Sequence, residues 1–375
     1  MGPFEPEALL ADIKPRYTRA KMIQVSGFAA TSPTEPLGPY RFERRDPRPD
    51  DVTIEILFCG VCHSDIHSAR NDWGGAKYPM VPGHEIVGRV VSVGAEVTRF
   101  TPGDHVGVGC LVDSCQQCPA CARGDENYCR AMVGTYNSTD RRDQRPTQGG
   151  YSDTIVVTER FVLKMPDGIE LKSAAPLLCA GITTWAPLRH WKVGKGTKLG
   201  VVGLGGLGHM ALKLGKALGA DVTLFTRSPG KAEDAQRLGA DRIVISTDAK
   251  QLKSVSGQFD LIIDTVPYVH DVNTYVPTLA INGTLVLVGY LGPLEPPLNS
   301  GPMIMGRKSV AGSVIGGIAE TQEMLDFCGA HGIASDVEMI GIDAINTAYE
   351  RMLKSDVKYR FVIDLASLAR ASTGG

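Results

Sequence analysis

Four cysteines lie close together in the first half of the chain. They are Cys115, Cys118, Cys121 and Cys129, separated by two, two and seven residues. Four thiolates this close in sequence can complete a tetrahedral shell around one Zn²⁺ and leave no open position, which is typical of a structural zinc site. Some ferredoxins bind iron–sulfur clusters through comparable spacing, so an iron–sulfur cluster is the alternative at this point.

A glycine-rich loop in the second half of the chain suits phosphate groups. Its pattern, G-x-G-x-x-G, is formed by Gly203, Gly205 and Gly208, with Gly206 and Leu207 between the last two. An apolar run ending at Val202 precedes the loop, and a helical pattern follows it. In that context, backbone N–H groups at the positive end of the helix bind a pyrophosphate and need no side chain. We therefore predict a dinucleotide site; an ordinary tight turn is the alternative.

The end of the next expected strand favours NADP over NAD. An NAD site usually places Asp or Glu there, to accept a hydrogen bond from the ribose 2′-hydroxyl. The residues found instead are Thr226, Arg227, Ser228 and, slightly later, Lys231. Hydroxyls and cations would bind a 2′-phosphate that a carboxylate would repel. Asp221 lies at the opposite end of the strand, and the alternative is that Arg227 and Lys231 are solvated surface charges.

Three further segments carry side chains that suit a catalytic metal. They are Cys62-His63-Ser64-Asp65-Ile66-His67, Gly83-His84-Glu85 and Leu178-Cys179-Ala180-Gly181. Two cysteines and one histidine would leave the fourth position of a tetrahedral zinc open for a substrate oxygen. Spacing alone does not link the three segments.

Two kinds of secondary-structure pattern must position these residues. In the first half, short apolar runs alternate with glycine-rich turns, which predicts a β-rich domain. The expected strands there are 52–58, 86–93, 105–108 and 155–157. From Lys198, strands and helices alternate, which predicts a parallel, doubly wound sheet of six strands. Those strands are 199–202, 222–226, 242–245, 259–264, 284–288 and 309–313, with helices around 209–218 and 231–238. A helix over 319–328 and a closing segment 360–365 follow, and the pattern does not assign them to either part.

The bulk properties limit the classes of protein. A chain of 375 residues predicts two domains. The formal net charge is −2, without a basic block, which argues against nucleic-acid and membrane-surface partners. No apolar stretch reaches the roughly 18 residues of a membrane span. Residues 1–21 lack the apolar core of a secretory signal, so we expect a loosely attached extension and a cytoplasmic protein, with 366–375 as a small-residue tail.

The cysteine distribution supports metal binding. Seven of the nine cysteines fall between Cys59 and Cys129. An odd number of cysteines, clustered in one part of such a chain, favours metal binding or catalysis over disulfide bonds. Outside the two candidate sets, we expect Cys59, Cys110 and Cys328 to be small buried residues.

The order of these motifs resembles the zinc-containing medium-chain dehydrogenase family, and most closely its cinnamyl-alcohol-dehydrogenase-type, NADP-dependent branch. The resemblance extends from about Lys21 to Leu365. It includes the three segments above, the four-cysteine lobe, Gly203-Leu204-Gly205-Gly206-Leu207-Gly208 and Asp356-Val357-Lys358-Tyr359-Arg360-Phe361.

The resemblance implies a fold and a domain division. The fold would be α/β: a β-rich, GroES-like catalytic domain plus a Rossmann domain. The catalytic domain would comprise residues 1–179 and 319–375, including a structural-zinc lobe at about 110–130, and residues 180–318 would bind NADP.

The resemblance also implies residue roles. Cys62, His84 and Cys179 would hold a catalytic zinc, with Glu85 close behind. Asp65 would orient His84, while Ser64 and His67 would relay a proton. His63 and Arg360 would approach the cofactor pyrophosphate, and Thr183 the nicotinamide. Trp73 and Tyr136 are either pocket-lining or packing residues.

The implied activity is interconversion of a primary alcohol and its aldehyde, aromatic or aliphatic, with NADP(H) and two zinc ions per chain. The branch also implies a homodimer built on the nucleotide domain, around residues 310–318. Three alternatives are open: reduction of a conjugated C=C or iminium bond on the same fold, a zinc-free quinone reductase, and a zinc-stabilised binding module without catalysis.

Overall fold

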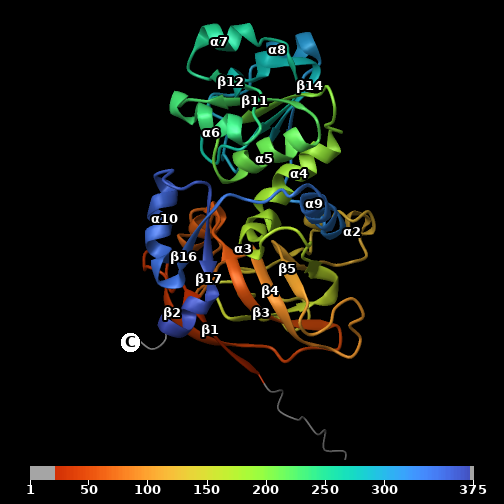
Figure 1. The fold of residues 1–375 in the computed structure, drawn as a ribbon, viewed down its shortest axis with the longest axis vertical. Helices are drawn as coiled ribbons and strands as arrows, with labels where there is room; N and C mark the ends of the chain where they lie inside the picture. Colours follow the sequence, from red (N-terminus) through yellow and green to blue (C-terminus); the bar gives the residue numbers. More distant parts are fainter. Residues whose placement is uncertain (1–21, 372–375) are drawn as a thin grey trace, which may run out of the picture.

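The computed structural model describes residues 22–371, so the predicted N-terminal extension lies outside the described residues. Two large sheets form the upper and lower bodies of the molecule (Figure 1). Among the described residues, no helix combines the length and apolar character needed to cross a membrane.

The upper body is a six-stranded parallel sheet in the order β12-β11-β10-β13-β14-β15. Its strands are β10 (Lys198–Val202), β11 (Asp221–Thr226), β12 (Arg242–Ile245), β13 (Phe259–Asp264), β14 (Leu279–Leu287) and β15 (Ser309–Gly312). Its helices are α5 (Gly206–Ala217), α6 (Ala232–Arg237), α7 (Ala249–Ser254) and α8 (Ser300–Gly306). The strand order reverses direction at β10, as in dinucleotide-binding doubly wound sheets. The predicted fold class is confirmed.

The lower body is a mixed sheet in the order β16-β17-β3-β4-β5-β9, with β8 also paired to β3. The strands are β3 (Asp51–Gly60), β4 (Ile86–Val93), β5 (His105–Val108), β8 (Thr154–Thr158), β9 (Leu163–Lys164), β16 (Val337–Gly341) and β17 (Arg360–Asp364). β17 runs antiparallel to β3, with Val362 opposite Gly60. The last strands of the chain therefore pair with strands from its first part (Figure 1).

Smaller elements surround this sheet and connect it to the upper body. The strand pairs are β1 (Ile23–Ala29) with β2 (Gly38–Arg44), and β6 (Leu111–Asp113) with β7 (Val133–Gly134). The helices are α1 (His63–Ala69), α2 (Pro119–Ala122), α3 (Leu171–Ala174), α4 (Ala180–His190), α9 (Ile318–His331), α10 (Ile345–Leu353) and α11 (Leu368–Ala371). One core cluster contains Val87 of the lower sheet, Trp185 of α4 and Val201 of the upper sheet, so α4 lies at the junction of the two bodies.

Two of the differences from the expectations concern helices. Helix α4 was absent from the sequence-based prediction because nine of its residues are buried, so its sequence shows no polar face that would mark a helix. The expected C-terminal tail is wrong for residues 366–371, which form a short 3₁₀ turn and α11. The Ser367 hydroxyl accepts the Ile342 N–H at 2.9 Å, and Leu365 is buried, so this segment packs on the lower body.

Candidate active site

A strand end and a helix start position the first thiol. Cys62 follows β3 and is the N-cap of α1, where its backbone N–H donates to Asp65 Oδ2 at 2.9 Å. The same fully buried carboxylate accepts the N–H of Gly83 and the Nδ1 of His84 through Oδ1, each at 3.1 Å. Asp65 therefore ties the Cys62 segment to the His84 segment and leaves the His84 Nε2 for another partner.

The third segment completes a cluster of donor atoms. Cys179 lies between a buried 3₁₀ turn and α4, and its Sγ is 3.9 Å from Cys62 Sγ. One ligand atom each from Cys62, His84, Glu85 and Cys179 lies within 4.8 Å of the others. Tetrahedral Zn–S bonds of about 2.3 Å place two sulfurs roughly 3.8 Å apart, so the sulfur separation fits a shared zinc. Hydrogen bonding to Cys179 lowers the pKa of the Cys62 thiol well below its usual range, which favours the metal-binding thiolate.

Cys110 differs from the expectation that it is an ordinary small buried residue. It is half-buried rather than buried, and its interaction with Cys179 lowers the pKa of its thiol to about 6. A hydrogen bond to His84 acts in the same direction. Cys110 therefore lies beside the donor cluster, whereas Cys59 and Cys328 are buried as expected.

A buried ion pair connects the donor cluster to the cofactor loop. Glu85 is fully buried and pairs with Arg360, which is 3% exposed and begins β17. A Cβ added at Gly206 would meet Arg360 Cδ at 2.6 Å, so a side chain there would displace this arginine from its place against the loop. The sequence placed Arg360 near the cofactor only by resemblance; its pairing with Glu85 comes from the fold.

The remaining residues predicted for catalysis lie on α1. His67 Nδ1 is 2.8 Å from Asp72 Oδ2, and the His67 ring stacks on Trp73 with centroids 5.1 Å apart. Trp73 in turn contacts Tyr290, which follows β14 of the upper body, at 5.7 Å. Sequence reasoning missed Asp72, although a carboxylate just after the helix that carries the histidine was a usable signal.

Ser64 and His63 occupy the first turn of α1. The Ser64 carbonyl accepts a hydrogen bond of 3.3 Å from the Tyr136 hydroxyl, and the Tyr136 ring stacks on His84 at 5.8 Å. Burial lowers the pKa of His63, which favours its neutral form. Tyr136 therefore packs against His84, one of the candidate metal ligands.

The glycine loop has the geometry that the motif predicts. It joins β10 to α5, and a Cβ at Gly208 would collide with the Gly203 carbonyl oxygen.

Thr183 lies in the first turn of α4 and donates its backbone N–H to the Cys179 carbonyl at 2.9 Å. This places Thr183 one helical turn after Cys179.

Polar residues gather at the carboxyl end of β11. The Ser228 N–H donates to Thr226 Oγ1 at 3.2 Å, and Lys231 Nζ donates to the Leu204 carbonyl of the glycine loop at 3.0 Å.

Arg227 is exposed and donates to the Tyr268 hydroxyl at 2.9 Å. As the sequence indicated, Asp221 lies at the other end of β11, where the structure pairs it with Lys198.

The second cysteine set forms a compact lobe around α2. The four ligand atoms lie within 4.8 Å of one another. Cys121 Sγ is 3.9 Å from Cys115 Sγ and 3.6 Å from Cys118 Sγ. These separations are close to the roughly 3.8 Å expected around one tetrahedral zinc, so a single ion fits the lobe. Backbone N–H groups of Cys118 and Ala131 point at sulfurs of the set at 3.3 and 3.4 Å.

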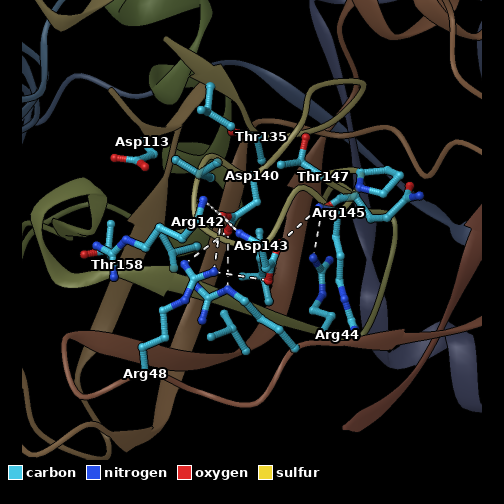
Figure 2. Close-up of a pocket in the computed structure, with 18 of the residues that line it drawn as sticks. Arg44, Arg48, Asp113, Thr135, Asp140, Arg142, Asp143, Arg145, Thr147 and Thr158 are labelled. Atoms are coloured by element: carbon cyan, nitrogen blue, oxygen red, sulfur yellow. Dashed lines mark hydrogen bonds and ion pairs between the residues drawn. The ribbon is translucent and has the colours of Figure 1, made fainter. Parts of the chain in front are cut away.

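A separate cavity of about 90 Å³ lies beside β2 and β8 and contains none of the predicted site residues. Figure 2 shows arginines and aspartates that point toward one another across it. Arg48 pairs with Asp140 at 3.2 Å and Asp143 at 3.1 Å, and Arg142 pairs with Asp50 at 2.6 Å. Ion pairs therefore hold these charged side chains in place, and none of the predicted site residues lines the cavity.

Comparison with known proteins agrees with this geometry. Residues 48–167 match the alcohol dehydrogenase GroES-like domain, and residues 206–330 match the zinc-binding dehydrogenase family. The chain is 53% identical to aldehyde reductase YahK of Escherichia coli, over 92% of this chain and 99% of that protein. It is 52% identical to NADP-dependent alcohol dehydrogenase C of Mycobacterium tuberculosis, over 92% of this chain and all of that protein.

Solved structures give the same result. A cinnamyl alcohol dehydrogenase from Sorghum bicolor superimposes with a TM-score of 0.89 at 48% identity, over 92% of this chain and 98% of that one. The structure of a CAD from Helicobacter pylori complexed with NADP(H) gives a TM-score of 0.86 at 44% identity, over 92% and 99%. With both domain families matched and relatives above 50% identity along most of its length, the chain belongs to the zinc-containing medium-chain alcohol dehydrogenases, in their cinnamyl-alcohol-dehydrogenase-type branch, and is an enzyme of that family.

Proposed function

We propose that this enzyme transfers hydride between NADP(H) and a primary alcohol or its aldehyde, aromatic or aliphatic. The observation that carries the proposal is the cluster of Cys62, His84 and Cys179, linked through Glu85 and Arg360 to a dinucleotide loop. The names of the relatives, NADP-dependent alcohol dehydrogenase and aldehyde reductase, support the same reaction.

Cys62, His84 and Cys179 would hold the catalytic zinc, and Glu85 lies among the same donor atoms as a nearby carboxylate. When bound, zinc would supply Lewis-acid stabilisation of a substrate oxygen. Asp65 would fix the tautomer of His84 by accepting the proton of Nδ1, so that Nε2 faces the metal. The Glu85–Arg360 pair would keep a negative and a positive charge balanced behind the site.

A proton would travel along α1. Ser64 would meet the substrate hydroxyl or carbonyl, and His67 would carry the proton toward solvent. Asp72 would hold His67 by its Nδ1 and stabilise the imidazolium when the proton is on the ring. His67 and Asp72 are part-exposed, which gives the proton an outlet to water.

The cofactor would lie along the upper sheet. Gly203, Gly205, Gly206, Leu207 and Gly208 would bind the pyrophosphate together with His63 and Arg360, and Thr183 would contact the nicotinamide. Thr226, Arg227, Ser228 and Lys231 would bind the 2′-phosphate, because they offer hydroxyls and cations at the end of β11. NADPH would supply the hydride.

The domain division and the second zinc follow the same reasoning. We assign residues 1–179 and 319–375 to the catalytic domain and 180–318 to the nucleotide domain. Pairing of β16 and β17 with the β3 sheet supports this division. Cys115, Cys118, Cys121 and Cys129 would hold a structural zinc, since all four donors come from one lobe and leave no open position.

The chain would act as a cytoplasmic homodimer, with no nucleic-acid or membrane partner. β15 is the edge strand of the upper sheet, and nearby Ile304 and Met305 are 76% and 87% exposed. An unpaired edge beside exposed apolar side chains suits a self-association surface. Nine cysteines without a disulfide among the described residues suit a reducing compartment.

The test is aldehyde reduction with purified enzyme, comparing NADPH and NADH on benzaldehyde and cinnamaldehyde, with zinc counted by metal analysis. Turnover with a strong NADPH preference and two zinc ions per chain is the expected result. A preference for NADH would overturn the 2′-phosphate assignment. Turnover of conjugated C=C or iminium substrates, with none of aldehydes, would overturn the proposed reaction.

A further inference from the structure

A residue outside the recognised motifs contacts the predicted 2′-phosphate site. Tyr268 lies in the loop that follows β13, and its hydroxyl accepts a hydrogen bond of 2.9 Å from Arg227 Nη2. The guanidinium carbon of Arg227 is also 5.7 Å from the centre of the Tyr268 ring. Tyr268 therefore holds Arg227 both by its hydroxyl and by the face of its ring.

Contacts made by His270 hold the loop that carries Tyr268 in place. His270 Nδ1 contacts the Tyr268 carbonyl at 2.9 Å, and His270 Nε2 contacts Asp264 Oδ2 at 2.8 Å. Asp264 is fully buried at the end of β13, and its Oδ1 accepts the Val266 N–H at 3.1 Å. The exposed tyrosine is thus anchored through His270 to a rigid point of the central sheet.

The positive charges of Arg227 and Lys231 are available to an anion. In the described part of the chain, neither Arg227 nor Lys231 forms an ion pair with a carboxylate. Burial lowers the pKa of Lys231, and the nearby charge of Arg227 acts in the same direction. Tyr268 orients Arg227 without neutralising it, because a phenol is uncharged. Within residues 22–371, the hydrogen bond to Tyr268 is the one recorded for the Arg227 guanidinium, whose remaining donors can face a phosphate.

We propose that Tyr268 is a positioning residue for cofactor choice: it holds Arg227 in the orientation that binds the 2′-phosphate of NADP(H). The inference rests on the proposed function, since it takes the 2′-phosphate to lie at the end of β11. An exposed arginine loses side-chain freedom when it binds a ligand, and an arginine already held by a neighbour loses less. The preference for a 2′-phosphate therefore depends on a residue from the β13 loop as well as on the β11 end.

The experiment measures binding, by titration calorimetry, of 2′,5′-ADP and 5′-AMP to the zinc-loaded full chain. The variants are Tyr268→Phe, Arg227→Ala and the double variant. Tyr128→Phe is the matched control, because Tyr128 is 53% exposed against 50% for Tyr268 and lies in the four-cysteine lobe. Phenylalanine keeps the ring and removes only the hydroxyl.

We expect Tyr268→Phe to weaken 2′,5′-ADP binding about three- to tenfold, the range of one hydrogen bond, and to leave 5′-AMP within about twofold. On the Arg227→Ala background the same change should have no effect, since no guanidinium is left to position. Equal losses on both nucleotides, no loss, or an undiminished loss without Arg227 would each overturn the inference. If the wild-type chain binds 5′-AMP as tightly as 2′,5′-ADP, the NADP assignment is wrong as well. If the wild-type chain prefers 2′,5′-ADP and Tyr268→Phe leaves that preference unchanged, only the role of Tyr268 is wrong.

Discussion

Replacing Asp65 by asparagine should loosen the catalytic zinc without unfolding the protein. Asp65 accepts four hydrogen bonds, from the Cys62 N–H at 2.9 Å and from the Gly83 N–H, His84 Nδ1 and the Tyr151 hydroxyl at 3.1 Å each. Asparagine has the same shape but presents an NH₂ group on one side. That group must face the Cys62 N–H or the His84 donor, and neither can turn to accept from it.

The magnitude follows from the strength of the hydrogen bonds that asparagine weakens or breaks. Hydrogen bonds to a charged group contribute about 1.5–3 kcal/mol, against about 0.5–1.5 kcal/mol for neutral pairs. Asparagine would therefore weaken two of the four hydrogen bonds and break one or two of them. Loss of a residue that orients a zinc-ligating histidine typically costs 10- to 100-fold in metal affinity, which is about 1.4–2.7 kcal/mol. We therefore expect Asp65→Asn to lower zinc affinity about 10- to 100-fold.

The assay is competition for zinc with a chelator of known affinity, together with the thermal unfolding midpoint. Asp51→Asn is the control, because Asp51 is also fully buried and accepts the Arg48 N–H at 2.6 Å, but it begins β3 at the end opposite Cys62. We expect Asp51→Asn to lower the midpoint without changing zinc affinity. Wild-type zinc affinity in Asp65→Asn, or an equal loss in both variants, would refute the assigned role of Asp65.

Three further changes test other parts of the site. Asp72→Asn should lower kcat about tenfold with little change in the KM for NADPH, because His67 loses the carboxylate that stabilises its protonated ring; steady-state kinetics and the solvent isotope effect measure this. Cys121→Ser should release one of two zinc ions, measured by metal analysis, and lower the unfolding midpoint, since a buried thiolate of the lobe is lost. Arg360→Met should cost about 3–5 kcal/mol of unfolding free energy in urea, because Glu85 would be left as a buried charge without its partner.

Local patterns were sufficient for much of the fold. The doubly wound sheet was predicted because its strands are short apolar runs and the helix after the glycine loop has one apolar face, so local periodicity reports the structure directly. Helix α4 was missed because burial on all sides removes that periodicity. The closing segment 360–365 was not assigned to either domain from pattern alone, and β16 was not predicted, since strand pairing across most of the chain has no local signature.

The sequence by itself determined the sites whose residues are neighbours in the chain. The four cysteines of the lobe and the glycine loop each lie within a short stretch, so spacing fixes which atoms can meet. Only the tertiary structure brought Cys62 next to Cys179, which is 117 residues away, and placed Arg360 against Glu85. It also placed Tyr268 beside Arg227 and Cys110 beside His84. The physical reason is that such contacts depend on how separate strands and helices pack, and spacing along a chain does not encode that packing.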